Sequence, residues 1–168
     1  MESKLPVFEN IWLADDDKDD CDLFKDVVHQ ILPLAKVSII SNGELLMQKL
    51  KDETGPDCLF LDINMPLMDG LECLLQIRAQ NCYKSLPVIM FSSTTQPEHL
   101  KAAYQYGANL FFSKPYSFAE LIAGLSSVFK MNWKDQKEGF ASRSDQTFDQ
   151  FLSSEKENGD NSQRITSI

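Results

Sequence analysis

The sequence predicts an α/β protein built on a parallel sheet with helices on both faces. Five short apolar segments alternate along the chain with five segments of helical periodicity. The apolar segment 58–61 contains no polar residue, which is typical of a strand buried on both faces of a parallel sheet. Alternation of this kind favours right-handed βαβ units, which pack helices on both sides of one sheet.

Each predicted strand is a short apolar run that stops at polar residues. The first run ends before three consecutive aspartates, the third before Asp62, the fourth before Ser92 and the fifth before Lys114. We place the strands at residues 7–14, 36–40, 58–61, 87–91 and 109–113.

Apolar spacing and capping residues predict the helices. The first helix has one apolar face, because its apolar residues recur at intervals of three, four and three. These residues are Cys21, Phe24, Val28 and Ile31. Three later helices open on capping boxes, in which Ser41, Thr95 or Ser117 precedes a Glu by three positions. The predicted helices are 17–32, Ser41 through Leu50, 71–80, 95–106 (ended by Gly107) and Ser117 through Phe129.

The composition fits one packed domain and excludes several function classes. Of the 168 residues, 43% are hydrophobic, and the formal net charge is −9. This acidic balance argues against general nucleic-acid binding and against a polybasic membrane anchor. The chain contains neither a run of about 18 apolar residues nor a signal-peptide pattern. We therefore expect a cytoplasmic protein that binds neither nucleic acid nor membrane.

The polar residues are distributed unevenly along the chain. From about residue 131 aliphatic residues are few, and Ser, Asp, Gln, Asn, Glu and Lys dominate. We predict a folded domain at 6–130 and a polar, partly disordered extension at 131–168 that is too short to be an effector domain. The four cysteines have no metal-binding spacing and are interpreted as small buried residues.

The candidate chemistry lies where the predicted strands end. In open parallel sheets, ligands bind beyond the carboxyl ends of the strands. Two like charges about 4 Å apart repel by roughly 4 kcal/mol at an effective dielectric constant of 20, so clustered carboxylates call for a cation. Oxygen ligands suit Mg²⁺, while Lys114 and Ser92 could bind phosphoryl oxygens. Asp62, central at the third strand, is the candidate nucleophile.

Four segments together resemble the receiver domains of two-component response regulators. They occur in order over roughly residues 7–130. The first is Leu13-Ala14-Asp15-Asp16-Asp17, and the second is the segment 61–70, which contains Asp62, Asn64, Pro66 and Asp69-Gly70. The third is the segment 87–93, which ends in Ser92-Ser93, and the fourth is Phe112-Ser113-Lys114-Pro115. The resemblance implies a doubly wound, five-stranded (βα)5 sheet of the flavodoxin-like type, with strand order 2-1-3-4-5.

The resemblance also implies a phosphorylation site. Asp62 would accept a phosphoryl group from a histidine kinase or a histidine phosphotransfer protein. Mg²⁺ would be bound by Asp16, Asp62 and the backbone carbonyl of Asn64, with Asp15 assisting. Lys114 would pair with a phosphoryl oxygen.

Further residues take roles by the same resemblance. Ser92 and Phe111 would form the switch, in which Ser92 turns towards the phosphoryl group and Phe111 packs behind it. Thr94 and Asn64 would tune hydrolysis, and the bond before Pro115 is expected to be cis. A receiver of this kind catalyses only its own phosphorylation and dephosphorylation and is not a conventional enzyme. Its downstream protein is unknown, and a homodimer is possible.

Two alternatives and one structural reading stand beside this hypothesis. A receiver fold could serve as a protein-interaction module that works without phosphorylation. A phosphatase of the haloacid-dehalogenase type is disfavoured, because Asn64 stands where that family needs a second acid. Acids favour the first turn of a helix, so a set of aspartates is interpreted as a solvated face. This set is Asp17, Asp19, Asp20, Asp22 and Asp26.

Overall fold

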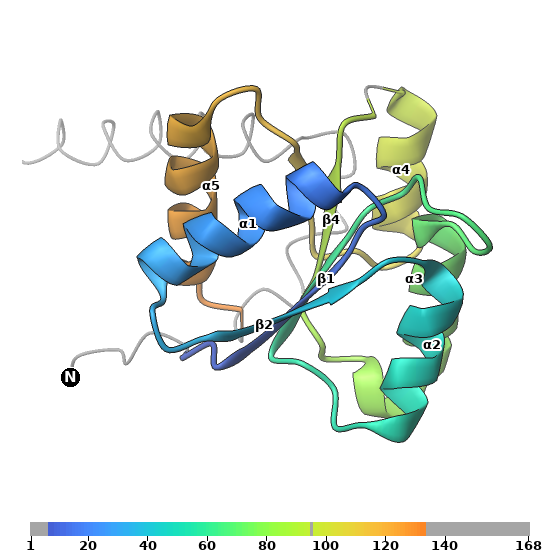
Figure 1. The fold of residues 1–168 in the computed structure, drawn as a ribbon. Helices are drawn as coiled ribbons and strands as arrows, with labels where there is room; N and C mark the ends of the chain where they lie inside the picture. Colours follow the sequence, from blue (N-terminus) through green and yellow to red (C-terminus); the bar gives the residue numbers. More distant parts are fainter. Residues whose placement is uncertain (1–6, 95, 134–168) are drawn as a thin grey trace, which may run out of the picture.

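The computed structural model describes residues 7–94 and 96–133, and its core is one parallel sheet (Figure 1). The strand order is β2-β1-β3-β4-β5, as the resemblance implied. The strands are β1 (Asn10–Ala14), β2 (Lys36–Ile40), β3 (Cys58–Leu61), β4 (Val88–Ser92) and β5 (Leu110–Ser113). The helices are α1 (Lys18–Ile31), α2 (Gly43–Asp52), α3 (Gly70–Ala79), α4 (Pro97–Gln105) and α5 (Phe118–Lys130), and an unpredicted 3-10 helix spans Asn81–Tyr83.

Helices cover both faces of the sheet, each over its own apolar cluster. Helices α1 and α5 lie on one face, and α2, α3 and α4 lie on the other (Figure 1). Beneath α1 and α5, the rings of Phe24 and Phe60 have centroids 4.9 Å apart, and Phe91 packs 5.5 Å from Phe112. Burial of one such side chain contributes about 1.5–3 kcal/mol. The two clusters therefore fix the strands, and with them the residues that follow each strand.

Two helix starts differ from the predicted capping boxes. Helix α2 is capped by Asn42, whose side chain accepts a hydrogen bond from the backbone N–H of Leu45 at 2.8 Å, so the cap is not the predicted Ser41. Asn and Ser are about equally good caps, and the Ser-to-Glu spacing does not decide between them. Helix α4 begins after Gln96, which makes no side-chain capping bond, and the predicted cap Thr95 lies outside the described residues.

The starts of α5 and α3 are capped by side chains. Ser117 caps α5 as predicted, because its Oγ accepts a hydrogen bond from the backbone N–H of Glu120 at 3.2 Å. A full capping box forms at α3, where Asp69 and Glu72 each accept from the other's backbone N–H. This box was not predicted from the sequence, although Asp is as good an N-cap residue as Ser.

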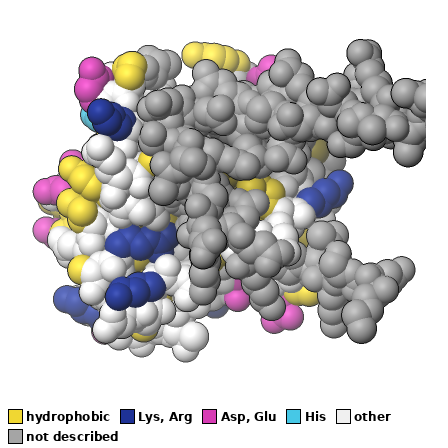
Figure 2. All heavy atoms as spheres, turned by 180° about the vertical axis from the view of Figure 1, so that it is seen from behind, with side chains coloured by type: hydrophobic (Ala, Val, Ile, Leu, Met, Phe, Trp, Pro, Cys, Tyr) yellow, Lys and Arg dark blue, Asp and Glu magenta, His cyan; other side chains and the backbone are white. Residues whose placement is uncertain are grey.

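The remaining predictions about the chain are met in part. Cys21, Cys58 and Cys73 are buried, but Cys82 is exposed because it lies in the 3-10 helix rather than in a packed element. Beyond residue 133, the predicted extension lies outside the described residues. Within the described part of the chain, no helix has the length and apolar character needed to cross a membrane. On the side shown in Figure 2, acidic, basic and uncharged side chains are interspersed.

Candidate functional site

Three carboxylates meet at the edge where β1 and β3 end. Ala14 and Leu61 are register partners, and the backbone N–H of Asp62 donates to the carbonyl of Ala14 at 2.9 Å. The residues that follow these partners therefore lie side by side. Asp15, Asp16 and Asp62 each offer a carboxylate oxygen, and these oxygens lie within 4.8 Å of one another. The structure thus brings together the three acids that the sequence analysis selected.

Lys114 places an ammonium group against two of these three acids, Asp15 and Asp62. It follows β5, whose last residue Ser113 pairs with Ser92 of β4. Its Nζ lies 2.7 Å from Oδ2 of Asp15 and 3.4 Å from Oδ2 of Asp62. Burial alone would lower the pKa of Lys114, but the neighbouring carboxylates outweigh burial and raise it. Lys114 is therefore a fixed positive charge at neutral pH.

Asp15 is the most buried of the three carboxylates. Its side chain is fully enclosed, and one oxygen accepts from the backbone N–H of Asp17 at 2.9 Å. The other oxygen, Oδ2, contacts Lys114 as an ion pair but makes no well-directed hydrogen bond within the described residues. Burial raises the pKa of Asp15, and the contact with Lys114 opposes that shift. This environment is costly for a carboxylate and would be relieved by a second cation.

The donor set fits a hard divalent cation. The converging groups are carboxylate oxygens, one of them buried without a hydrogen bond, and no thiolate or imidazole is among them. Mg²⁺ and Mn²⁺ prefer oxygen ligands of this kind. Asn64, proposed from the resemblance as a backbone ligand, lies in the exposed loop two residues after Asp62.

Ser92 and Thr94 lie at the carboxyl end of β4, the strand next to β3 in the sheet. Ser92 is fully buried at the end of β4, and its Oγ accepts a hydrogen bond from the backbone N–H of Thr94 at 3.4 Å. The Oγ1 of Thr94 is in turn 3.1 Å from Nδ1 of His99 on α4. These contacts link the Ser92 hydroxyl at the end of β4 to α4, the helix that follows.

Phe111 is packed inside the protein. It belongs to β5, is only 1% exposed, and lies in the apolar cluster under α2, α3 and α4. Its backbone N–H donates to the hydroxyl of Tyr104 on α4 at 3.1 Å. The inward position that the sequence analysis expected only after phosphorylation is thus already occupied here.

Two further findings correct the sequence analysis. Asp20, interpreted there as part of a solvated acidic face, pairs with Lys114 at 2.8 Å. No sequence signal distinguished Asp20 from the other aspartates that start α1, since all of them satisfy the preference for acids in a first turn. The bond before Pro115 is not cis, since the described residues contain no cis peptide bond. Trans is the more stable isomer, and Lys114 reaches its partners with it.

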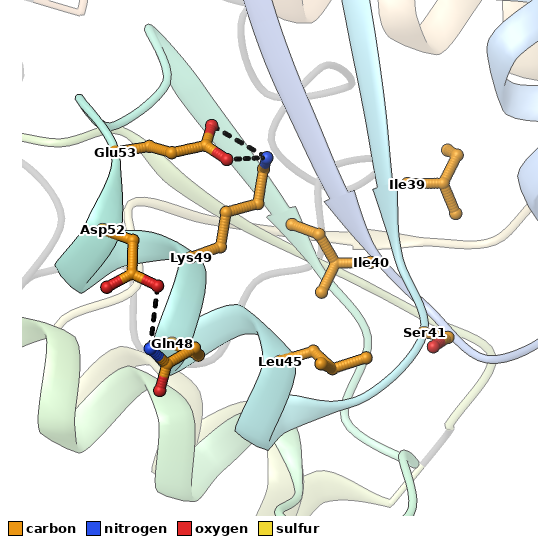
Figure 3. A pocket seen from close by; sticks show the side chains of 8 residues that line it. All are labelled: Ile39, Ile40, Ser41, Leu45, Gln48, Lys49, Asp52 and Glu53. Carbon is orange, nitrogen blue, oxygen red and sulfur yellow. Dashed lines mark hydrogen bonds and ion pairs between the residues drawn. The ribbon is translucent and has the colours of Figure 1, made fainter.

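A separate hollow lies beside the edge strand β2 (Figure 3). It encloses about 400 Å³ between β2 and α2. Its polar groups pair along the helix, Lys49 with Glu53 at 2.8 Å and Gln48 with Asp52 at 2.8 Å. Each pair joins residues four positions apart along the chain, and among the described residues the hollow has no convergence of three carboxylates like that at the acidic edge.

A comparison with known families identifies the class of protein that this fold and edge define. A sequence model described as response regulator receiver domain matches residues 11–126. The match covers more than half of the chain, and the chain belongs to the response regulator receiver domain family. Its sheet is the flavodoxin-like sheet of that family, and receiver domains act in two-component phosphorelay signalling.

Individual proteins resemble this chain in sequence or in fold. The chain is 36% identical over 103 residues to a protein-glutamate methylesterase/protein-glutamine glutaminase of Trichodesmium erythraeum; the match covers 58% of this chain but only 28% of that relative. The phosphorylated cyanobacterial phytochrome response regulator RcpA superposes with a TM-score of 0.68 at 23% identity, over 73% of this chain and 91% of RcpA. The Mn²⁺-bound form of the response regulator Rcp1 superposes with a TM-score of 0.61 at 22% sequence identity, over 71% of this chain and 91% of Rcp1.

Proposed function

We propose that residues 6–130 of this chain form a receiver domain that is phosphorylated on Asp62 by a histidine kinase or a histidine phosphotransfer protein. The observation that carries the proposal is the position of Lys114, whose ammonium contacts both Asp62 and Asp15 beside the cluster of three acids. An ammonium beside an acceptor carboxylate suits an incoming phosphoryl group, because phosphoryl transfer depends mainly on positioning and charge neutralisation.

The acceptor acts as a nucleophile. A carboxylate oxygen of Asp62 attacks phosphorus while the P–N bond to the donor histidine breaks, and that electron pair returns to the imidazole nitrogen. Lys114 then binds an oxygen of the transferred group. Asp62 is nearly buried, which limits the water that could compete with it or hydrolyse the product.

Mg²⁺ is the proposed cofactor, held by Asp15, Asp16, Asp62 and the backbone carbonyl of Asn64. When bound, the cation supplies positive charge that offsets the carboxylates and the phosphoryl oxygens. Support comes from the oxygen-only donor set and from the Mn²⁺-bound form of the related Rcp1. Asp16 is the exposed member of the three acids, and Asp15 orients the site from within.

Signal output is proposed to run through Ser92 and Phe111. Ser92 would turn its hydroxyl from the backbone of Thr94 to a phosphoryl oxygen, with Thr94 tuning hydrolysis. Because Phe111 is already buried, phosphorylation would hold it inward rather than draw it in. The changed surface of α4, β5 and α5 would meet an unidentified downstream protein or a second copy, and we propose a cytoplasmic location. The module catalyses only its own phosphorylation and dephosphorylation.

The test is incubation with acetyl phosphate and Mg²⁺, followed by intact-mass measurement. The wild-type chain should gain one phosphoryl group, and Asp62→Asn should gain none. Asp26→Asn, which removes an exposed carboxylate of α1, is the matched control and should be phosphorylated like wild type. No gain in the wild type, or an equal gain in Asp62→Asn, would overturn the proposal. Equal affinity of both proteins for a partner would support an interaction module instead.

A further inference from the structure

The ammonium of Lys114 contacts three carboxylates, and its contact with Asp62, the proposed phosphoryl acceptor, is the longest. Nζ lies 2.7 Å from Asp15 and 2.8 Å from Asp20, but 3.4 Å from Asp62. An ammonium has three N–H donors, and its hydrogen bonds to Asp20 and Asp62 already use two of them, beside the ion pair with Asp15. A phosphoryl group on Asp62 must therefore compete for a lysine that is already engaged.

Asp20 is the partner that can yield. The side chain of Asp15 is fully buried and that of Asp62 is 8% exposed, whereas the side chain of Asp20 is 42% exposed. An exposed carboxylate can return to water at low cost, because water replaces the contact that it loses. The carboxylate of Asp15 cannot be hydrated in this way, because its side chain is fully buried.

Local structure aims Asp20 at the lysine. Asp17 caps α1 by accepting a hydrogen bond from the backbone N–H of Asp20 at 3.0 Å. The backbone N–H of Asp17 is bound in turn by Asp15 at 2.9 Å. These hydrogen bonds hold the first turn of α1 at the acidic edge. The carboxylate of Asp20 therefore contacts Lys114, which follows β5 and lies 94 residues further along the chain.

We propose that Asp20 is a positioning residue that holds Lys114 in the unphosphorylated state and is displaced when a phosphoryl group binds. It acts as a competitor: its carboxylate lowers the availability of the ammonium and adds a negative charge close to the incoming anion. This role rests on the proposed function of the site. It predicts that removal of the carboxylate favours the phosphoryl-bound state.

The experiment is a titration with beryllofluoride, a phosphoryl mimic, at saturating Mg²⁺, followed by fluorine NMR of the full chain. Asp20→Asn should bind it about two- to fivefold more tightly than wild type, the range expected for loss of a partly exposed ion pair. Asp19→Asn is the matched control, because Asp19 is acidic, exposed and in the same first turn but forms no ion pair within the described residues. Its affinity should change less than twofold.

A conservative variant separates the contact from the fold. Asp20→Glu keeps a carboxylate that can reach Nζ, and its affinity should stay within twofold of wild type. The inference is overturned if Asp20→Asn binds no more tightly than Asp19→Asn, or if Asp20→Glu behaves like Asp20→Asn. Either of these results for the Asp20 variants would leave the proposed function intact. Failure of the wild type to bind beryllofluoride would instead overturn the proposed function.

Discussion

Lys114 and Asp15 form an ion pair of 2.7 Å that joins the end of β5 to the end of β1, the last and first strands of the described fold. Solvent does not reach the carboxylate of this pair, since the side chain of Asp15 is fully buried. It therefore ties distant parts of the chain together at the place where the proposed chemistry occurs, and stability and function share the same contact.

Replacement of Lys114 by Met should destabilise the protein in the absence of Mg²⁺. Asp15 would lose its counter-ion, and breaking a buried pair costs about 3–5 kcal/mol. The side chain of Lys114 is itself 11% exposed, so water can replace part of the lost contact, and we expect a smaller loss of about 1–3 kcal/mol. Urea denaturation at pH 7 measures it. Lys101→Met, at an exposed position on α4, is the control, and an equal effect of both changes would contradict the prediction.

Mg²⁺ should stabilise the folded chain. A ligand that binds only the native state adds about 1.4 kcal/mol at a concentration tenfold above its dissociation constant. The thermal midpoint should therefore rise with Mg²⁺ concentration and return to its starting value with EDTA. Asp16→Asn removes an exposed oxygen ligand without opening the core, so this variant should fold and show little Mg²⁺ response. A midpoint that rises equally in both proteins would argue against this site.

The strands could be predicted because their pattern is local. Uninterrupted apolar runs and abrupt polar ends mark β3 and β4 without any knowledge of contacts, and the rule that ligands bind at strand ends then selects Asp15, Asp62 and Lys114. Their proximity follows from the parallel order of the strands. Three of the most important site residues were therefore accessible from the sequence.

The role of Asp20 could not be read in the same way. Several neighbouring aspartates start α1, and all of them satisfy the preference for acids in a first turn. Only the packing of α1 against the sheet decides which of them meets Lys114. The inward position of Phe111 likewise depends on the cluster beneath α2, α3 and α4, which residue spacing does not determine.

The cysteines should differ sharply in reactivity. Burial raises the pKa of Cys21 and that of Cys73 to about 12, and it raises the pKa of the fully buried Cys58 well above its usual range. The thiolate is the reactive form, so these thiols should react slowly at pH 8. Cys82 is exposed. A thiol–disulfide exchange reagent should therefore release one fast equivalent from the native chain, and Cys82→Ser should abolish this phase. A second fast equivalent would contradict the structure.

Asn109 should be required for stability but not for phosphorylation. Its Oδ1 accepts hydrogen bonds from the backbone N–H of Val88 and from the guanidinium of Arg78, both at 2.8 Å. These residues lie where β4 and β5 begin, opposite the acidic edge. Asn109→Ala leaves both donors without this acceptor and should lower the free energy of unfolding by about 1–3 kcal/mol. Phosphate uptake from acetyl phosphate should be unchanged at temperatures where the variant is folded.

Asn109→Asp is the control for that prediction. A carboxylate keeps the acceptor and adds an opposite charge beside Arg78, so its stability at pH 7 should stay close to wild type. Urea denaturation of the three proteins measures the differences. If Asn109→Ala matched wild type in stability, the hydrogen bonds at this edge would contribute little. If instead it folded normally but lost phosphorylation, the two edges of the sheet would be coupled, and the separation argued here between the stabilising edge and the acidic edge would be wrong.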